Sequence, residues 1–178
     1  MAGFFRRQLA DYVEYHRDPW NCAAHVFGII SLFLAAILPL TLWPVSAFGG
    51  ETSLAVVMAL PVLLYWLALD AMVGLAIVVA ATLLFSTAAV IVANASVACV
   101  CALATGLAVT GVASQVVGHT LFERRKPSMA DHPAHFLLGP PFVMAKLFIA
   151  LGFRNDLAAI IGPAAEAPVG ATSHQREL

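Results

Sequence analysis

The sequence predicts an all-α, polytopic membrane helix bundle with four transmembrane helices and a C-terminal interfacial or re-entrant helix, both termini being cytoplasmic. The first observation is composition: of 178 residues, 61% are apolar and 11% are charged. Soluble domains contain about 25% charged residues, so most of this chain is expected to lie in lipid. The second is that residues 71–120 contain no Asp, Glu, Lys or Arg. The third is that no basic residue lies between Arg17 and Arg124, which leaves no basic patch for nucleic acid.

The first predicted span covers residues 20–43. A helix needs about 20 apolar residues to cross a hydrocarbon core of about 30 Å, and this run is long enough. Asp18 is suited to cap the helix and Pro19 to occupy its first position. Pro39 and Pro44 bring the helix to an end, and residues 48–51 form a turn that contains two glycines.

Three further spans follow the turn. The second covers residues 53–69, with a kink expected at Pro61. Asp70 interrupts the apolar run and predicts a turn at the membrane surface. The third span covers residues 71–92, and Asn94 marks the turn before a fourth span that ends near Gly118.

Four spans place both termini on one side of the membrane, and the distribution of basic residues assigns that side to the cytoplasm. Residues 136–152 are apolar but short and contain Pro140 and Pro141. A fifth span here would export Arg154, so an interfacial or re-entrant helix is favoured. Residues 1–157 form one membrane-embedded catalytic domain, and the tail 158–178, rich in Ala, Pro and Gly, is expected to be disordered. The membrane would be the inner membrane of a bacterium or the endoplasmic reticulum of a eukaryote.

Two rows of residues in the fourth span recur at a spacing of four. The first is a stripe of small side chains that lets another helix approach closely, and it consists of Ala98, Ala102, Gly106, Thr110, Ser114 and Gly118. The second row becomes polar toward the cytoplasmic end and consists of Gly111, Gln115, His119 and Glu123. The first row predicts packing and the second predicts a functional site.

The predicted topology gathers five of the six histidines at or just below the cytoplasmic surface, and these are His16, His25, His119, His132 and His135. Ionisable groups within membrane spans are costly and are functional candidates. Neutral imidazole is the commonest metal ligand, and an amide or carboxylate usually orients it. Asn21 lies one turn before His25, and Gln115 and Glu123 lie one turn on either side of His119, so each histidine has a possible orienting partner.

Two groups of residues resemble the signatures of the 2-hydroxy fatty acid dioxygenase family, which includes the fungal enzyme of phytosphingosine degradation. The first group is Tyr12, Tyr15, His16, Pro19, Asn21, His25 and Gly28. The second group is Gln115, Gly118, His119, Phe122, Glu123 and Pro127. Segments at 141–142 and 151–153 are similar to the C-terminal part of the family, so the resemblance extends to about residue 155.

The resemblance implies a multi-span membrane enzyme that requires Fe(II). Its activity would be α-oxidation of a 2-hydroxy fatty acid with O2 to the fatty acid one carbon shorter. The resemblance transfers His16, His25 and His119 as essential histidines, and Asn21 and Glu123 as motif positions with a catalytic role. His132 or Glu123 would complete the iron site, and His135 is a further alternative.

A 2-hydroxy acid can chelate iron through its carboxylate and hydroxyl groups. Arg124 and Arg125 are suited to meet the carboxylate, with Tyr12 and Gln115 as further substrate-binding candidates. The other interpretation of the basic cluster is an anchor on anionic lipid. The lipid bilayer is the expected surrounding, and association into a homo-oligomer is left open.

Two other classes of function are compatible with the pattern. A transporter of a metal or a small acid would need polar groups along a path across the membrane, and residues 71–109 offer few. A haem-binding helical bundle would use paired histidines as axial ligands.

Overall fold

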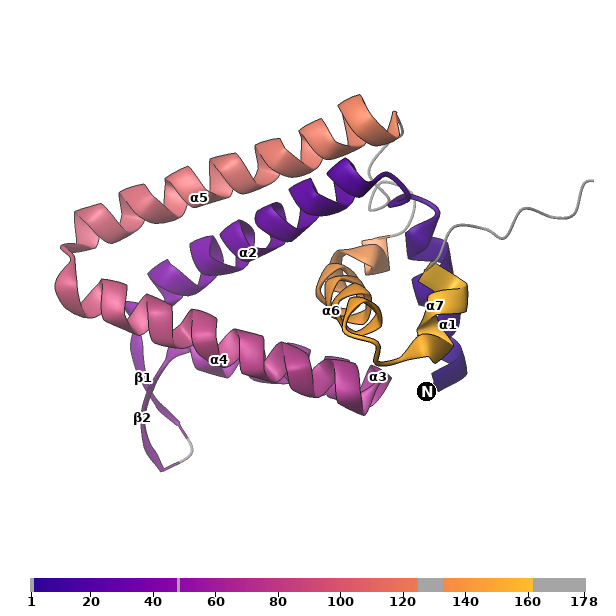
Figure 1. Ribbon diagram of the computed structural model, residues 1–178. Coiled ribbons are helices and arrows are strands. Elements are labelled where there is room, and N and C mark those ends of the chain that lie inside the picture. Colours follow the sequence, from indigo (N-terminus) through magenta and orange to yellow (C-terminus); the bar gives the residue numbers. More distant parts are fainter. Residues whose placement is uncertain (1, 48, 125–132, 162–178) are drawn as a thin grey trace, which may run out of the picture.

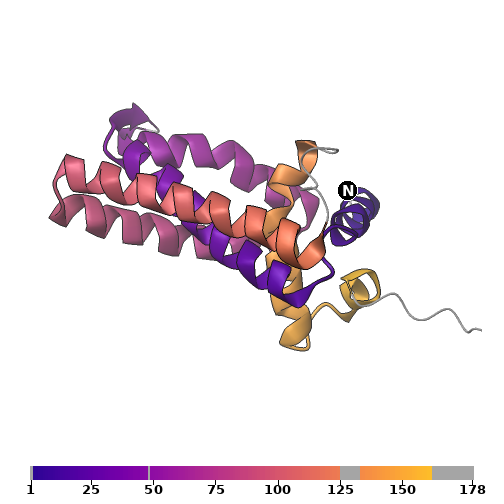
Figure 2. The same cartoon turned by 90° about the horizontal axis from the view of Figure 1, so that it is seen from above.

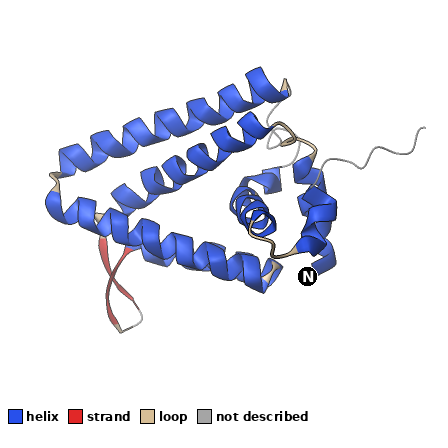
Figure 3. Cartoon of the chain, in the orientation of Figure 1, coloured by secondary structure: helices blue, strands red, loops and turns tan. Residues whose placement is uncertain are grey.

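The computed structural model describes residues 2–47, 49–124 and 133–161 (Figure 1). Helices dominate this part of the chain (Figure 3). The helical elements are α1 (Ala2–Val13), α2 (Pro19–Thr41), α3 (Leu54–Leu69), α4 (Ala71–Asn94), α5 (Val97–Val117), the π-helix η1 (Gly118–Glu123), the 3-10 helix η3 (Pro133–Leu137), α6 (Gly139–Ala150) and α7 (Asn155–Ile161). The helix ends agree closely with the span boundaries that the sequence predicts.

The beginning of α2 confirms the predicted cap. The Asp18 side chain accepts hydrogen bonds from the backbone N–H groups of Trp20 and Asn21, at 2.8 and 3.1 Å. Pro19 occupies the first helical position, where its missing N–H costs nothing. Asp70 caps α4 in the same way, by accepting from the Val73 N–H at 3.0 Å. Short polar side chains at the two surface turns therefore fix where two long apolar helices start.

Helices α2 to α5 lie along one another, and the chain reverses direction at each connection (Figures 1 and 2). Three segments are long and apolar enough to cross a membrane, and they are Pro19–Thr41, Ala71–Asn94 and Val97–Glu123. Helix α3 has 16 residues, or about 24 Å at 1.5 Å per residue, which is shorter than the usual span. The chain thus has the helices of a membrane bundle, while the predicted count of four spans stays a prediction.

A short β-hairpin corrects the expectation of a simple turn after α2. Strand β1 (Pro44–Ala47) pairs antiparallel with β2 (Gly50–Ser53), and Val45 lies opposite Thr52. Gly49 supplies a positive φ of 80° at the tip, which suits a tight connection. The glycines of the predicted turn therefore lie at the tip of a hairpin, in which the two β-branched residues Val45 and Thr52 face each other across the strands.

Helices α1, α6 and α7 lie at the end of the bundle where α2 and α4 begin and where α5 ends (Figure 1). Helix α6 is seen along its axis in Figure 1 and runs across the bundle in Figure 2. Its 12 residues correspond to about 18 Å, too short for a fifth span. Its interfacial or re-entrant position in a membrane remains a prediction. Its buried face packs Phe142 and Ala145 into the core that α1, α3 and α7 share.

The packing face of α5 differs from the predicted small-residue stripe. Ala98, Ala102, Gly106 and Thr110 are exposed in the described chain. The buried face instead contains Val100, Ala104, Gly111 and Gly118. A helix turns by 100° per residue, so a row at a spacing of four drifts around the helix over twenty residues. Only the last members of the predicted stripe, Ser114 and Gly118, therefore reach α2.

Helix α7 extends the ordered region past residue 157, the predicted end of the domain. Leu157 is fully buried in the core, and Ile160 and Ile161 pack against it. The expectation of a disordered tail from residue 158 is therefore wrong for residues 158–161, because their apolar side chains find a surface to cover. Residues 162–178 lie outside the described residues.

Candidate metal centre

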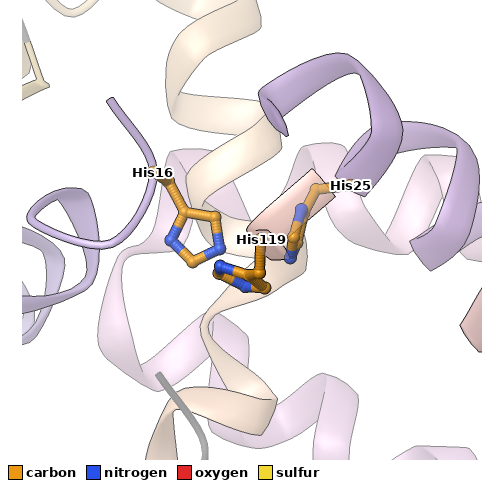
Figure 4. A group of neighbouring side chains, drawn as sticks. All are labelled: His16, His25 and His119. Carbon is orange, nitrogen blue, oxygen red and sulfur yellow. The ribbon is translucent and has the colours of Figure 1, made fainter. Parts of the chain in front are cut away.

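Three buried histidines face one another at the end of the bundle where α2 begins and α5 ends. His16 follows α1, His25 is in the second turn of α2, and His119 is in η1. Each offers one ring nitrogen, and these three atoms lie within 4.8 Å of one another. Figure 4 shows the three imidazoles pointing into one common space. Their exposed fractions are 2–3%, so water has little access to them.

The tautomers of His16 and His25 follow from their hydrogen bonds. The Nδ1 atom of His16 lies 2.9 Å from the carbonyl oxygen of Tyr12, and the Nδ1 atom of His25 lies 3.0 Å from that of Asn21. A carbonyl only accepts, so each Nδ1 carries the proton and each Nε2 presents a lone pair. Within the described residues, His16 Nε2 and His119 Nδ1 are buried without a hydrogen-bond partner. Unsatisfied imidazole nitrogens that converge can serve as the donor set of a metal site.

The charge state of His16 agrees with this arrangement. Burial lowers the pKa of His16 to about 3. The hydrogen bond to the Tyr12 carbonyl opposes this effect, and the neighbouring His25, His119 and His135 lower the pKa further. The ring is therefore neutral at physiological pH, which is the form that binds metals. Tyr12 stacks on it, with ring centroids 4.0 Å apart and planes 7° apart. Burial raises the pKa of Tyr12 above its usual range, so the phenol stays neutral as well.

A π-helical segment places His119. After α5 ends at Val117, residues 118–123 form η1, and the backbone N–H of Arg124 bonds to the carbonyl of His119. This wider turn shifts the register of the residues that follow, and π-helical turns often occur at functional sites. Gly118 lies against α2, where an added Cβ would overlap Asn21 Oδ1. Glycine at 118 therefore allows the segment that bears His119 to reach the start of α2.

Glu123 occupies a different position from the one that its spacing predicts. Its carboxylate accepts from the backbone N–H groups of Arg17 and Asp18, at 2.8 and 3.0 Å, and from Asn21 Nδ2 at 3.2 Å. It does not belong to the group of converging metal-ligand atoms among the described residues. Its spacing predicts a contact with the His119 ring, whereas its hydrogen bonds among the described residues go to the segment at the start of α2. In this geometry Glu123 clamps the two segments that bear the histidines, and its expected role as a ligand stays a prediction.

Asn21 connects the clamp to the histidines. It is fully buried, its amide donates to Glu123 and to the Tyr15 carbonyl at 3.2 Å each, and its own carbonyl accepts from His25. Asn21 thus fixes the loop before α2 and one candidate ligand at once. The sequence correctly predicts that Asn21 lies beside His25, but the contact is made by the backbone carbonyl rather than by the amide.

A cavity of about 290 Å³ opens beside the three histidines. Tyr12 and Gln115, which the sequence assigns to substrate binding, both line it. Arg124 is exposed at the end of η1 and does not line it. Arg125 and His132 lie outside the described residues, so their predicted roles stay predictions. The rest of the wall is mainly apolar.

His135, which the sequence analysis names as an alternative iron ligand, is a further polar residue of the cavity wall. It is 3% exposed and approaches Tyr12 edge-on at 5.6 Å between ring centroids. The Trp66 Nε1 atom donates to the Leu137 carbonyl at 2.8 Å, which holds η3 against α3. The predicted topology places His135 in the same layer as the other four histidines, but its distance to them depends on how η3 packs.

The fold and the site define a class: a helical protein with membrane-compatible helices and a cluster of three buried histidines beside a largely apolar cavity. The model of the 2-hydroxy-palmitic acid dioxygenase Mpo1-like family matches residues 3–151. The chain therefore belongs to this family, as the two signature groups predict. No curated protein and no solved structure matches the chain significantly.

Proposed function

We propose that this protein is an Fe(II)-dependent dioxygenase that converts a 2-hydroxy fatty acid and O2 to the fatty acid one carbon shorter. The observation that carries the proposal is the convergence of His16, His25 and His119 within the region that the family model matches. The family name supports a dioxygenase that acts on a 2-hydroxy acid with a long acyl chain.

The donor set fits a non-haem iron. Three neutral nitrogens would hold the ion on one side, and non-haem Fe(II) oxygenases leave the remaining positions open for substrate and O2. Iron bound there would activate O2 and accept the carboxylate and hydroxyl groups of the substrate. The carbonyls of Tyr12 and Asn21 hold the Nδ1 protons of His16 and His25, so both Nε2 lone pairs stay directed at the ion.

The cavity suits an amphipathic acid. Tyr12, Gln115 and His135 provide polar groups near the histidines, while the remainder of the wall is apolar. The neutral phenol of Tyr12 can donate a hydrogen bond to a carboxylate without adding a buried charge. The apolar wall excludes water from the hydroxyl-bearing carbon, which limits side reactions during oxidation.

The expected location is a membrane, with the site on its cytoplasmic side. The three long apolar helices support the first part. The second part rests on the absence of basic residues between Arg17 and Arg124, because the histidines lie at the end of the bundle near both basic regions. A substrate that partitions into the bilayer would reach this end from the cytoplasmic leaflet.

Metal analysis of the detergent-purified protein tests the proposal first. We expect near-stoichiometric iron in the wild type and loss of that iron in His119→Ala, because the variant removes one of three converging nitrogens. Thr120→Ala is the matched control, since Thr120 is exposed on the same segment and bonds only locally to α5. This control should retain iron.

The activity assay follows with 2-hydroxypalmitate, O2 and a reductant. The wild type and Thr120→Ala should release the acid one carbon shorter, and His25→Ala and His119→Ala should not. A wild type that binds no iron and turns over no 2-hydroxy acid after anaerobic loading with Fe(II) would contradict the proposed function. Full turnover in either histidine variant would contradict the ligand assignment alone.

A further inference from the structure

A second apolar hollow lies on the other side of α2 from α5. It has a volume of about 260 Å³ and is formed by α2, α4 and α6, together with Trp66 of α3. Its lining exposes no polar surface in the described chain. We name it the α2–α4 groove, and its residues on α2 and α4 lie in the middle part of each helix, between residues 26 and 33 and between residues 77 and 84.

The α2–α4 groove adjoins the histidine cavity. Three residues line both spaces, and these are Ile29, Phe33 and Pro140. Ile29 and Phe33 are four residues apart and so lie on the same face of α2. Pro140 lies opposite them, at the start of α6. The two spaces are therefore separated by a few side chains rather than by a helix.

Between α2 and α5, the described residues leave little room for a ligand that extends from the histidine cavity. An added Cβ at Gly111 would lie 2.8 Å from Leu32 Cγ, and one at Gly28 would lie 3.0 Å from the Gly111 carbonyl oxygen. The two helices thus touch directly below the histidines. Among the described residues, Ile29, Phe33 and Pro140 border a second apolar space into which a long ligand with its polar end at the histidines can extend.

The size of the histidine cavity makes this extension necessary. Pockets for drug-sized ligands measure about 300–1,000 Å³, and the cavity lies at the bottom of that range. It is polar at one end, where the histidines lie, whereas the groove is apolar throughout. A ligand with one polar end and a long, unbranched hydrocarbon chain matches this arrangement of a polar site beside an apolar groove.

We propose that the α2–α4 groove binds the acyl tail of the 2-hydroxy fatty acid whose polar end lies at His16, His25 and His119, with Phe33 and Ile29 at the passage between the two. This inference rests on the proposed function for the identity of the acid. It adds a site for the tail, and it makes the groove the element that selects long chains over short ones.

A substitution that fills the groove tests the proposal. Ala81 lies in the groove but not in the histidine cavity, so Ala81→Phe should displace the tail and leave the iron site unchanged. The value of kcat/KM for 2-hydroxypalmitate should fall about tenfold or more, the loss expected when about two methylenes leave an apolar environment. That for 2-hydroxyoctanoate should stay within about twofold, because its tail ends before Ala81.

The matched control is Ala89→Phe, which adds the same side chain at an exposed position of α4 outside the groove. This control should leave the kcat/KM values for both acids unchanged. Val143→Phe fills the groove from α6 and provides a second test if Ala81→Phe fails to fold. Equal effects of a folded groove variant on the two acids, or no effect on either, would overturn the proposal.

A binding measurement separates this proposal from the proposed function. Trp66 lines the groove and is 4% exposed, whereas Trp20 and Trp43 are largely exposed. In a Trp20→Phe, Trp43→Phe background, 2-hydroxypalmitate brominated near the end of its chain should quench Trp66 fluorescence saturably. Unlabelled 2-hydroxypalmitate should reverse the quenching, and Ala81→Phe should abolish it.

The same measurement distinguishes the source of the chain. Equal quenching by a phospholipid brominated at the same chain position, with no displacement by the free acid, would mean that bilayer lipid fills the groove, and it would overturn the proposal. Displaceable quenching in a protein that turns over no 2-hydroxy acid would support the groove and contradict the proposed function.

Discussion

Glu123 holds together two segments that are more than a hundred residues apart in the sequence. Its carboxylate receives the N–H groups of Arg17 and Asp18 and the amide of Asn21, all near the start of α2. Helix N-termini leave N–H groups without partners and attract negative charge. The contact therefore stabilises α2 and fixes the distance between His119 and the histidines at 16 and 25. These bonds engage both carboxylate oxygens. Glu123 therefore influences the histidines by fixing the positions of the segments that carry them.

Glu123→Gln distinguishes a clamp from a metal ligand. The amide keeps one acceptor but turns its NH2 group toward N–H donors and removes the charge, so we expect a loss of about 1–2 kcal/mol in the free energy of unfolding. Thermal unfolding in detergent measures it. Iron content should remain near that of the wild type at temperatures where the variant is folded.

Glu14→Gln is the control for loss of a carboxylate in the same region. The Glu14 side chain is about half exposed in its ion pair with Arg17, so the change should cost about 0.5 kcal/mol or less. Loss of iron from folded Glu123→Gln, to the extent seen in His119→Ala, would return Glu123 to the ligand set.

At the scale of elements, the close approach of α2 and α5 positions the candidate site. Gly28, Gly111 and Gly118 remove the side chains that would separate the helices. Without Cβ atoms at these positions, the two backbones come near enough for His25 and His119 to face each other at 4.7 Å between ring centroids. Small residues at helix interfaces provide this kind of packing in membranes.

Gly28→Ala should therefore destabilise the protein. Its Cβ would lie 2.7 Å from Ser114 Oγ and 2.8 Å from Gln115 Cγ, and the backbone of Gly111 behind them cannot yield easily. Overpacking of this kind costs about 1–3 kcal/mol. Unfolding in detergent, compared with the wild type, provides the measurement.

Gly106→Ala is the matched control, because nothing lies within 4 Å of an added Cβ there. Alanine is preferred over glycine in a helix, so this variant should be neutral or more stable by up to about 1 kcal/mol. Similar destabilisation by Gly28→Ala and Gly106→Ala would show that the loss of stability does not arise from overpacking between α2 and α5.

At the scale of the molecule, the two ends of the described chain meet beside the histidine end of the bundle. Arg154, at a positive φ of 53°, donates to Asp70 at 2.8 Å and to Asp156 at 2.9 Å, and Arg6 donates to Asp156 at 2.6 Å. These contacts join α1, the α3–α4 turn and α7. They hold the C-terminal segment, which includes α6, across the end of the bundle.

The docking of this segment should weaken in acid. Burial alone would raise the pKa of Asp70, but the hydrogen bonds from Arg154 and Val73 outweigh it and lower the pKa below its usual value. A lowered carboxyl pKa gives stability that is present above the unfolded pKa and is lost as pH falls through the folded pKa. The protection of residues 139–161 against hydrogen exchange, relative to the intrinsic exchange rate at each pH, should therefore fall below about pH 4.

Asp70→Asn tests the assignment, since it removes the titrating group and keeps much of its shape. The variant should exchange faster than the wild type at neutral pH, and the difference should shrink in acid. A wild-type segment that docks equally well at pH 3 and pH 7 would contradict the role of Asp70.

Much of the fold follows from local signals along the chain. Long apolar runs define the helices, and Asp18 and Asp70 define two starts because short carboxylates satisfy free N–H groups at helix ends. The order of the motif residues also suffices to predict the family that residues 3–151 match. The hairpin and the packing face of α5 are not predicted, because pairing partners and helix rotation depend on neighbours that local sequence does not specify.

The sequence by itself determined a membrane-compatible helical protein with histidines at one end, because hydropathy and charge act along the chain. The resemblance of the two signature groups singles out His16, His25 and His119, but only the tertiary structure shows that their three rings meet. His16, His25 and His119 converge, and Glu123 bonds to the start of α2, because a π-helical turn and three close glycine contacts set the register of α5 against α2. Such contacts join residues about a hundred positions apart, and helical spacing carries no information over that range.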